Sequence, residues 1–225
     1  MSKQETFGLL EDKMLKYADL VDIPVKPMNE EMVRVVERSG LRVNSIDPNM
    51  QPFTGEDIYL RRETFVQLSN AANMIRQILR PRLELEIVYG YRALSIQTKL
   101  YKKIKADLED QYEGIDLMEA AHRMIAVPEV SGHPTGGAVD VQLTQDGEPI
   151  DFGTKIWEFT PDSYAFSPYV SNEAWNNRQL LRRVMTSAGF APFDGEWWHF
   201  SFGDREWAKY YGEPAAVYEQ IEFSS

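Results

Sequence analysis

The stretch SGHPTGGAVD, residues 131–140, places one histidine among small residues and ends on an aspartate that opens an apolar run. Residues 138–143 that follow form a strand-like run. Gly132, Gly136 and Gly137 let the backbone bend sharply, so that a loop histidine and a strand aspartate can approach each other. We therefore predict a flexible loop whose histidine is held by a metal ion rather than by core packing.

Composition limits what such a protein can be. The chain has 225 residues, of which 43% are hydrophobic and 26% charged, which suits a compact domain with a substantial core. A net charge of −11 argues against nucleic-acid backbones and anionic membranes as partners. Because cysteine is absent, disulfides are excluded and any metal ligand must be His, Asp or Glu.

The first forty residues differ from the rest of the chain. Pro24 and Pro27 interrupt them, and we expect residues 1–40 to be an N-terminal extension and 41–225 the main domain. The N-terminus lacks the apolar run of a secretory signal, and no run approaches the length of a membrane span. We expect a cytoplasmic protein, with the periplasm as the alternative.

Apolar spacing predicts the main elements. Steps of three and four predict a helix over 62–79 that is ended by Pro81, and alternation predicts a half-buried strand over 83–89. The further expected elements are helices over 9–17, from Asn29 to Ser39, from a Ser95 cap to Leu108 and from an Asn172 cap to Gly189, and strands over 41–46 and 138–143. This pattern predicts an α+β fold, with a small, mostly antiparallel sheet and helices packed on one side.

Three residues provide a complete ligand set for a metal. A catalytic zinc takes three protein ligands and keeps one position open. Without cysteine, two imidazoles and one carboxylate are the natural set, and His133, Asp140 and His199 supply it. The remaining histidine is His122. We therefore predict one Zn²⁺ per chain on these three residues.

Two further residues add catalytic chemistry. Glu196, three positions before His199 in EWWH, is placed to act as general base toward water on the metal. Arg92, at the end of YGYR, is placed to stabilise an oxyanion. Because residues three apart face opposite sides of a strand, we predict a bulge or tight turn within EWWH. The alternatives are a buried aromatic strand at EWWHF, a turn cap at Asp140 and a structural ion pair at Arg92.

With these motifs in view, the sequence resembles the D-alanyl-D-alanine dipeptidases of the vancomycin-resistance type, within the zinc D,D-peptidase family with a hedgehog-like fold. That family's pattern is SxHxxGxAxD followed by ExxH, and here it reads Ser131, His133, Gly136, Ala138 and Asp140, then Glu196 and His199. The doubled tryptophan of EWWHF, the GYR at 90–92 and the QPFTG at 51–55 also resemble the dipeptidases. The likeness covers roughly residues 41–202.

The resemblance implies zinc on His133, Asp140 and His199, Glu196 as catalytic base, and Arg92 as stabiliser of the tetrahedral intermediate. It also implies a substrate-binding role for Ser131 and Arg92, and hydrolysis of free D-alanyl-D-alanine in cell-wall precursor metabolism or glycopeptide resistance.

Three positions depart from the family pattern. Gly132 stands where a second serine is usual, and Tyr89 and Trp157 stand where acids are usual. Two other functions stay open: a D,D-carboxypeptidase or peptidoglycan endopeptidase, and a non-catalytic, zinc-stabilised binding module.

Overall fold

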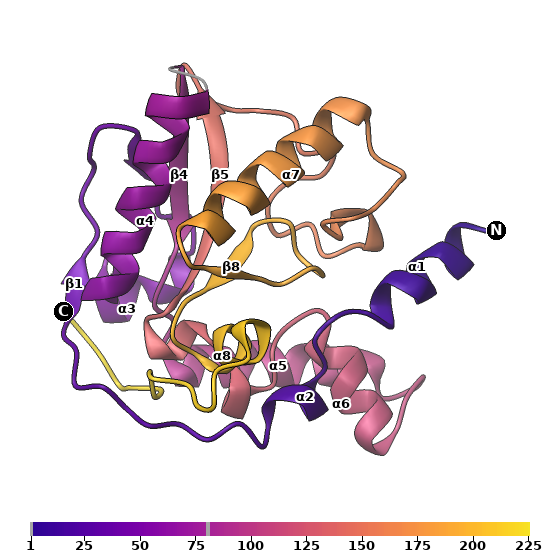
Figure 1. The fold of residues 1–225 in the computed structure, drawn as a ribbon. Coiled ribbons are helices and arrows are strands. Elements are labelled where there is room, and N and C mark those ends of the chain that lie inside the picture. Colours follow the sequence, from indigo (N-terminus) through magenta and orange to yellow (C-terminus); the bar gives the residue numbers. More distant parts are fainter. Residues whose placement is uncertain (1, 80–81) are drawn as a thin grey trace.

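The computed structural model describes residues 2–79 and 82–225, and one mixed sheet lies at its centre (Figure 1). The sheet has the order β2-β4-β5-β8-β7, with β6 on the side of β5, and β1 and β3 form a separate pair. The strands are β1 (Met32–Arg34), β2 (Leu41–Val43), β3 (Tyr59–Arg61), β4 (Leu83–Tyr89), β5 (Ala138–Gln145), β6 (Glu148–Pro149), β7 (Ala191–Pro192) and β8 (His199–Ser201). The β2–β4 pairing is parallel and the other described pairings are antiparallel, which confirms the predicted α+β class.

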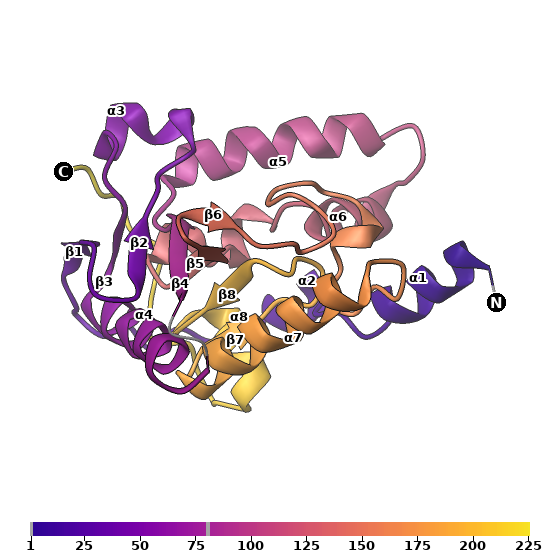
Figure 2. The same ribbon diagram turned by 90° about the horizontal axis from the view of Figure 1, so that it is seen from above.

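Helices lie on both sides of the sheet. They are α1 (Lys3–Glu11), α2 (Tyr17–Leu20), α3 (Gln51–Thr54), α4 (Arg62–Met74), α5 (Leu94–Leu108), α6 (Gly114–His122), α7 (Asn172–Ser187) and α8 (Arg205–Tyr211). Residues of α4 and α7 share one core with the sheet on one of its sides, but the prediction that all helices pack on that side is wrong. Seen from above, α5 lies on the opposite side from α4 and α7 (Figure 2), and residues of α5 and α6 form a second, smaller hydrophobic cluster together with Leu20 of α2.

The central strands are more deeply buried than their alternating pattern predicts. Leu85 and Ile87 are fully buried in β4, as expected, but Glu86 on the opposite face is also only 3% exposed. Its carboxylate accepts a hydrogen bond from Gln142 of β5 (2.7 Å) and lies near Arg42. The prediction of a half-buried strand is therefore wrong on this face, because neighbouring polar side chains cover the carboxylate.

One predicted helix near the N-terminus is wrong. The segment from Asn29 to Ser39 contains β1, which pairs antiparallel with β3 so that Val33 lies opposite Leu60. A β-branched residue in a short pairing segment is suited to a strand, and the pairing partner is too distant in sequence for local spacing to reveal it. The first helix is also shifted: it begins at Lys3, because Ser2 and Glu5 form a capping box.

Other boundaries differ by small amounts. The helix predicted over 62–79 is α4 up to Met74 and then a π-helical turn over 75–79, and its predicted stop, Pro81, lies outside the described residues. Helix α5 begins after Ala93 rather than with Ser95 as its cap. Helix α7 is capped by Ser171, one residue before Asn172, and ends at Ser187. Gly189, with φ +88°, follows the C-cap Ala188 as predicted.

The N-terminal segment packs along the rest of the chain. Val25 forms a bridge with Ala216, and Arg61 donates to the carbonyl oxygen of Glu30 (2.5 Å). The boundary at residue 40 stays a prediction. Among the helices in the described part of the chain, none is both long and apolar enough to cross a membrane.

Candidate active site

Three adjacent strands bring a row of side chains together. In the sheet register, Tyr89 of β4 lies opposite Asp140 of β5, and Asp140 lies opposite His199 of β8. The register of β4 against β5 shifts between Ile87 and Tyr89. The row therefore places the predicted carboxylate ligand between a phenol and the predicted second imidazole, all at one end of the sheet.

A tight turn joins Glu196 to His199, as the sequence predicts. The backbone N–H of His199 donates to the carbonyl oxygen of Glu196 (3.2 Å), and that of Glu196 donates to Phe193 (3.1 Å). Trp197 and Trp198 within this turn are both buried. The turn therefore packs its two indoles in the core and leaves the flanking carboxyl group and imidazole on the site.

His133 lies in a buried turn, so the prediction of a flexible loop is wrong. Residues 133–135 form a 3₁₀ turn, and His133 is 5% exposed. Gly136 ends the turn with φ +77°, where glycine is needed for its backbone freedom. Gly132 and Gly137 are needed for space instead, because a Cβ at either position would overlap Asp204 Oδ2 or the carbonyl oxygen of Phe202.

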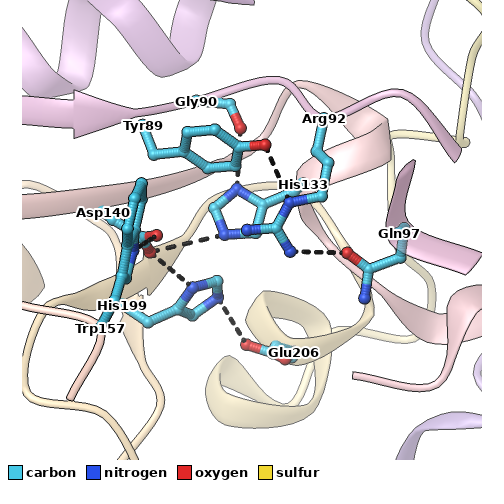
Figure 3. Close-up of polar contacts among 9 residues, drawn as sticks. All are labelled: Tyr89, Gly90, Arg92, Gln97, His133, Asp140, Trp157, His199 and Glu206. Carbon is cyan, nitrogen blue, oxygen red and sulfur yellow. Dashed lines mark hydrogen bonds and ion pairs between the residues drawn. The ribbon is translucent and has the colours of Figure 1, made fainter. Parts of the chain in front are cut away.

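His133, Asp140 and His199 lie together as one potential metal site. Their ligand atoms are all within 4.8 Å of one another, and all three residues are buried. Asp140 Oδ1 is 3.0 Å from His199 Nδ1 and 3.5 Å from His133 Nε2 (Figure 3). Two imidazoles and one carboxylate at this separation fit the donor set of a catalytic zinc, with no cysteine required.

Hydrogen bonds fix which imidazole nitrogen faces the cluster. His133 Nδ1 lies 2.8 Å from the carbonyl oxygen of Gly90, and since a carbonyl can only accept, Nδ1 carries the proton and Nε2 keeps its lone pair. His199 Nε2 lies 3.4 Å from a carboxylate oxygen of Glu206, which leaves Nδ1 toward Asp140. Both rings are thus oriented by an outer partner, as is usual for metal-binding histidines.

Burial and charge shift the pKa values of the three residues apart. Burial alone would raise the pKa of Asp140, but His133 and His199 lower it far below its usual range. Burial lowers the pKa of His133, with Asp140 opposing. Burial would also lower the pKa of His199, but hydrogen bonds to Asp140 and Glu206 raise it well above the usual value. The cluster therefore holds an ionised carboxylate that is ready to bind a cation.

Glu196 lines the same cavity as the cluster. Burial raises the pKa of its carboxyl group to about 8, with His199 opposing. A carboxyl group with a pKa near neutrality is suited to taking up and releasing a proton at neutral pH, and a neighbouring cation would favour its ionised form.

Arg92 is held in place by two neighbours. Its Nε donates to the hydroxyl of Tyr89 (3.0 Å) and its Nη1 to Oε1 of Gln97 (2.7 Å). Burial would lower the pKa of Arg92, but Tyr89 and Asp140 raise it. The guanidinium is a fixed positive charge beside the cluster, and its Nη2 donates to no side chain of the described residues.

Ser131 and His122 line the cavity as well. Ser131 lies two residues before His133, so its side chain is at the cavity, as its predicted substrate role requires. His122 lies outside the metal cluster, and its Nδ1 accepts a hydrogen bond from the backbone of Val127 (3.3 Å).

Three residues at the site were missed or given no role by the sequence reasoning. Glu206 orients His199 from the first turn of α8, Gln97 orients Arg92 from α5, and Trp157 donates its indole N–H to Asp140 (2.9 Å). The signal available in the sequence for Glu206 is an acid in the first helical turn, two positions after the possible helix cap Asp204. Nothing in local spacing indicates the other two contacts.

The loop that carries Trp157 is anchored by α7. The buried guanidinium of Arg178 donates to the carbonyl oxygens of Phe152, Asp162 and Tyr164 (2.7–2.8 Å). Burial lowers the pKa of Arg178 to about 10. One side chain therefore ties three points of the loop to the main core.

A buried imidazole–carboxylate cluster beside a carboxyl group of raised pKa is the arrangement that metal-dependent hydrolases use to activate water. Comparison with known families identifies the type of hydrolase. The chain belongs to the peptidase family M15, whose model is described as D-Ala-D-Ala dipeptidase and matches residues 46–217. Membership of a peptidase family favours an enzyme over the non-catalytic binding module.

Curated relatives carry the same description. The chain is 26% identical over 227 residues to a D-alanyl-D-alanine dipeptidase of Synechocystis sp., covering 89% of this chain and 90% of the relative. It is 33% identical over 119 residues to one of Escherichia coli, covering 52% and 54%. Among solved structures, VanYB in complex with D-alanine-D-alanine has a TM-score of 0.46 and 15% identity, covering 88% of this chain and 94% of that one.

Proposed function

We propose that this protein is a zinc-dependent D,D-dipeptidase that hydrolyses D-alanyl-D-alanine to two molecules of D-alanine. The observation that carries the proposal is the buried cluster of His133, Asp140 and His199, which shares a cavity with Glu196 and Arg92. The family and its curated relatives supply the substrate.

The residues divide the reaction among them. The bound metal would supply Lewis-acid activation of the attacking water. Glu196 takes a proton from that water and later gives it to the leaving amine, a role typically contributing roughly 10²–10⁴ in rate. Arg92 offers its free N–H groups to the carbonyl oxygen as negative charge develops there.

A second cavity favours one rival function. It adjoins the first, and the two share Met124, Phe159 and Glu196 as lining residues. A substrate longer than a dipeptide would extend past Glu196 into this space. A D,D-carboxypeptidase that removes the terminal residue from a longer peptide is therefore the second candidate.

One assay separates the two candidates and tests the first. The zinc-loaded protein is incubated with D-Ala-D-Ala, L-Ala-L-Ala and a muropeptide that ends in D-Ala-D-Ala, and free D-alanine is measured. We expect release from the D,D-dipeptide, none from the L,L-dipeptide and little from the muropeptide. Preference for the muropeptide would favour the carboxypeptidase.

The variant Glu196→Gln tests the role of Glu196 as the general base. It removes the proton acceptor but keeps the size of the side chain, so we expect an unchanged zinc content and a rate lower by about 10²–10⁴. Full activity in this variant, or a wild-type protein that holds zinc and releases no D-alanine, would refute the proposed mechanism.

A further inference from the structure

We propose that Trp157 is a positioning residue for the metal site, which holds Asp140 so that one carboxylate oxygen faces the two histidines and the other is occupied by the indole N–H. The inference rests on the metal cluster of the proposed function. It gives a role to a residue that stands where the resembled dipeptidases carry an acid.

The two oxygens of Asp140 have separate partners. Oδ2 accepts the hydrogen bond from Trp157 Nε1 at 2.9 Å, whereas Oδ1 faces His199 Nδ1 at 3.0 Å. Figure 3 shows the indole beside the carboxylate, on the side away from the histidines. A carboxylate can bind a metal through one or two oxygens, and a fixed N–H donor on Oδ2 favours binding through Oδ1 alone. Binding through one oxygen would leave room for water beside the three protein ligands.

The backbone conformation of Trp157 is a second observation that favours a functional role for this residue. Its φ is +62°, a conformation that is a clear outlier for a bulky side chain. Such outliers persist where the surroundings impose them, and they concentrate at functional sites. A turn holds this one: the backbone N–H of Glu158 donates to Lys155 (3.2 Å), and the carboxylate of Glu158 accepts from the N–H of Lys155 (3.1 Å).

The indole of Trp157 is also held by an aromatic contact with Tyr89. The ring of Tyr89 meets it edge to face, with centroids 5.5 Å apart, and Tyr89 in turn contacts the His133 ring at 5.2 Å and lies under the guanidinium of Arg92. These ring contacts fix the direction of the Trp157 N–H. A substitution that keeps an aromatic ring can therefore test the N–H donor separately from the ring packing.

Trp157→Phe makes that separation, because it keeps an aromatic ring and removes the N–H donor. The measurement is the zinc dissociation constant of the metal-free protein, by competition with a chromophoric chelator and without substrate. We expect zinc binding to weaken by about 10–100-fold, as for other partners of metal ligands, while the melting temperature of the metal-free protein changes little.

Trp207→Phe is the matched control. Its Nε1 donates to the carbonyl oxygen of Gly189 (3.2 Å), so the same kind of bond is lost away from Asp140, and we expect zinc affinity to stay within about twofold. Trp157→Gly and Trp157→Ala form a second pair. Glycine adopts φ +62° without strain, so the metal-free Gly variant should melt no lower than the Ala variant, and both should bind zinc at least tenfold more weakly.

Wild-type zinc affinity in Trp157→Phe or Trp157→Gly would overturn the proposal and leave Trp157 a packing residue. A wild-type protein that binds no zinc would instead refute the proposed function itself. The two failures are therefore distinguishable in one titration series.

Discussion

Gly132 shows how a single position at the site is fixed by space rather than by backbone conformation. Its φ of −76° is open to any residue, yet a Cβ there would overlap Oδ2 of Asp204 and touch the Cβ of Ala138. The buried carboxyl group of Asp204 thus occupies the space that a side chain at position 132 would need. A side chain as large as that of serine therefore does not fit at position 132 unless Asp204 moves.

We predict that Gly132→Ala destabilises the fold by about 1–3 kcal/mol, the usual cost of overpacking. Gly8→Ala is the control, because no atom lies within 4 Å of the Cβ position at Gly8. It should be neutral or stabilising by about 0.5–1 kcal/mol, since alanine favours a helix. The measurement is urea unfolding of each variant.

The clash with Asp204 can be tested by a double-mutant cycle. Asp204→Ser is shorter but still able to cap a helix, so Gly132→Ala should cost less in that background. An equal cost in both backgrounds would show that Asp204 is not the obstacle.

At the scale of elements, the site depends on turns and helix ends attached to a rigid sheet. Strands β4, β5 and β8 set the row of Tyr89, Asp140 and His199, and short turns deliver His133 and Glu196 to it. Helix α8 adds the outer partner Glu206. A site divided among so many elements depends on the position of each, which makes the cap of α8 a functional as well as a structural feature.

The cap of α8 should make stability depend on pH. Asp204 Oδ1 accepts from the N–H of Trp207 (2.9 Å), and burial, with the nearby charge of Glu206, raises the pKa of Asp204 to about 7. Between about pH 4 and pH 7 the folded state then holds a proton that the unfolded state has lost. The free energy of unfolding therefore falls as pH rises through this range.

Asp204→Asn keeps the cap and removes this titration. We expect the variant to gain stability relative to wild type as pH rises from 5 to 8, by on the order of a few kcal/mol at most, in urea unfolding of the metal-free protein. Asp47→Asn, at the cap of the 3₁₀ turn Pro48–Met50, is the control. If the difference in unfolding free energy between Asp204→Asn and wild type stays constant with pH, the raised pKa assigned to Asp204 is contradicted.

At the scale of the whole molecule, the sequence predicted those elements whose formation depends on residues close together in the chain. Strand β4, strand β5 and helix α4 follow from apolar spacing within each segment, and the ligand set follows from residue types that a metal requires. The strand at 32–34 was missed because its partner at 59–61 is far along the chain. The bond from Trp157 to Asp140 was missed because a positive φ on a tryptophan has no signature in sequence.

The cluster also predicts how the whole chain responds to metal. The ligand atoms of the three buried side chains lie within 4.8 Å of one another in the folded state. If zinc binds only this state, zinc at 100 times its dissociation constant should add about 2.7 kcal/mol to the free energy of unfolding. For a chain of this size that raises the melting temperature by about 5–10 °C, and a chelator should reverse it.

Two histidine variants test whether that shift arises at the proposed ligands. His133→Gln should lose most of the zinc-dependent shift in thermal unfolding, because it removes one of three ligands. His122→Gln alters a buried histidine outside the cluster, so it should melt lower with and without zinc and keep the shift between them. A shift that survives in His133→Gln, or disappears in His122→Gln, would place the cation elsewhere and remove the basis for assigning the open coordination position to this cavity.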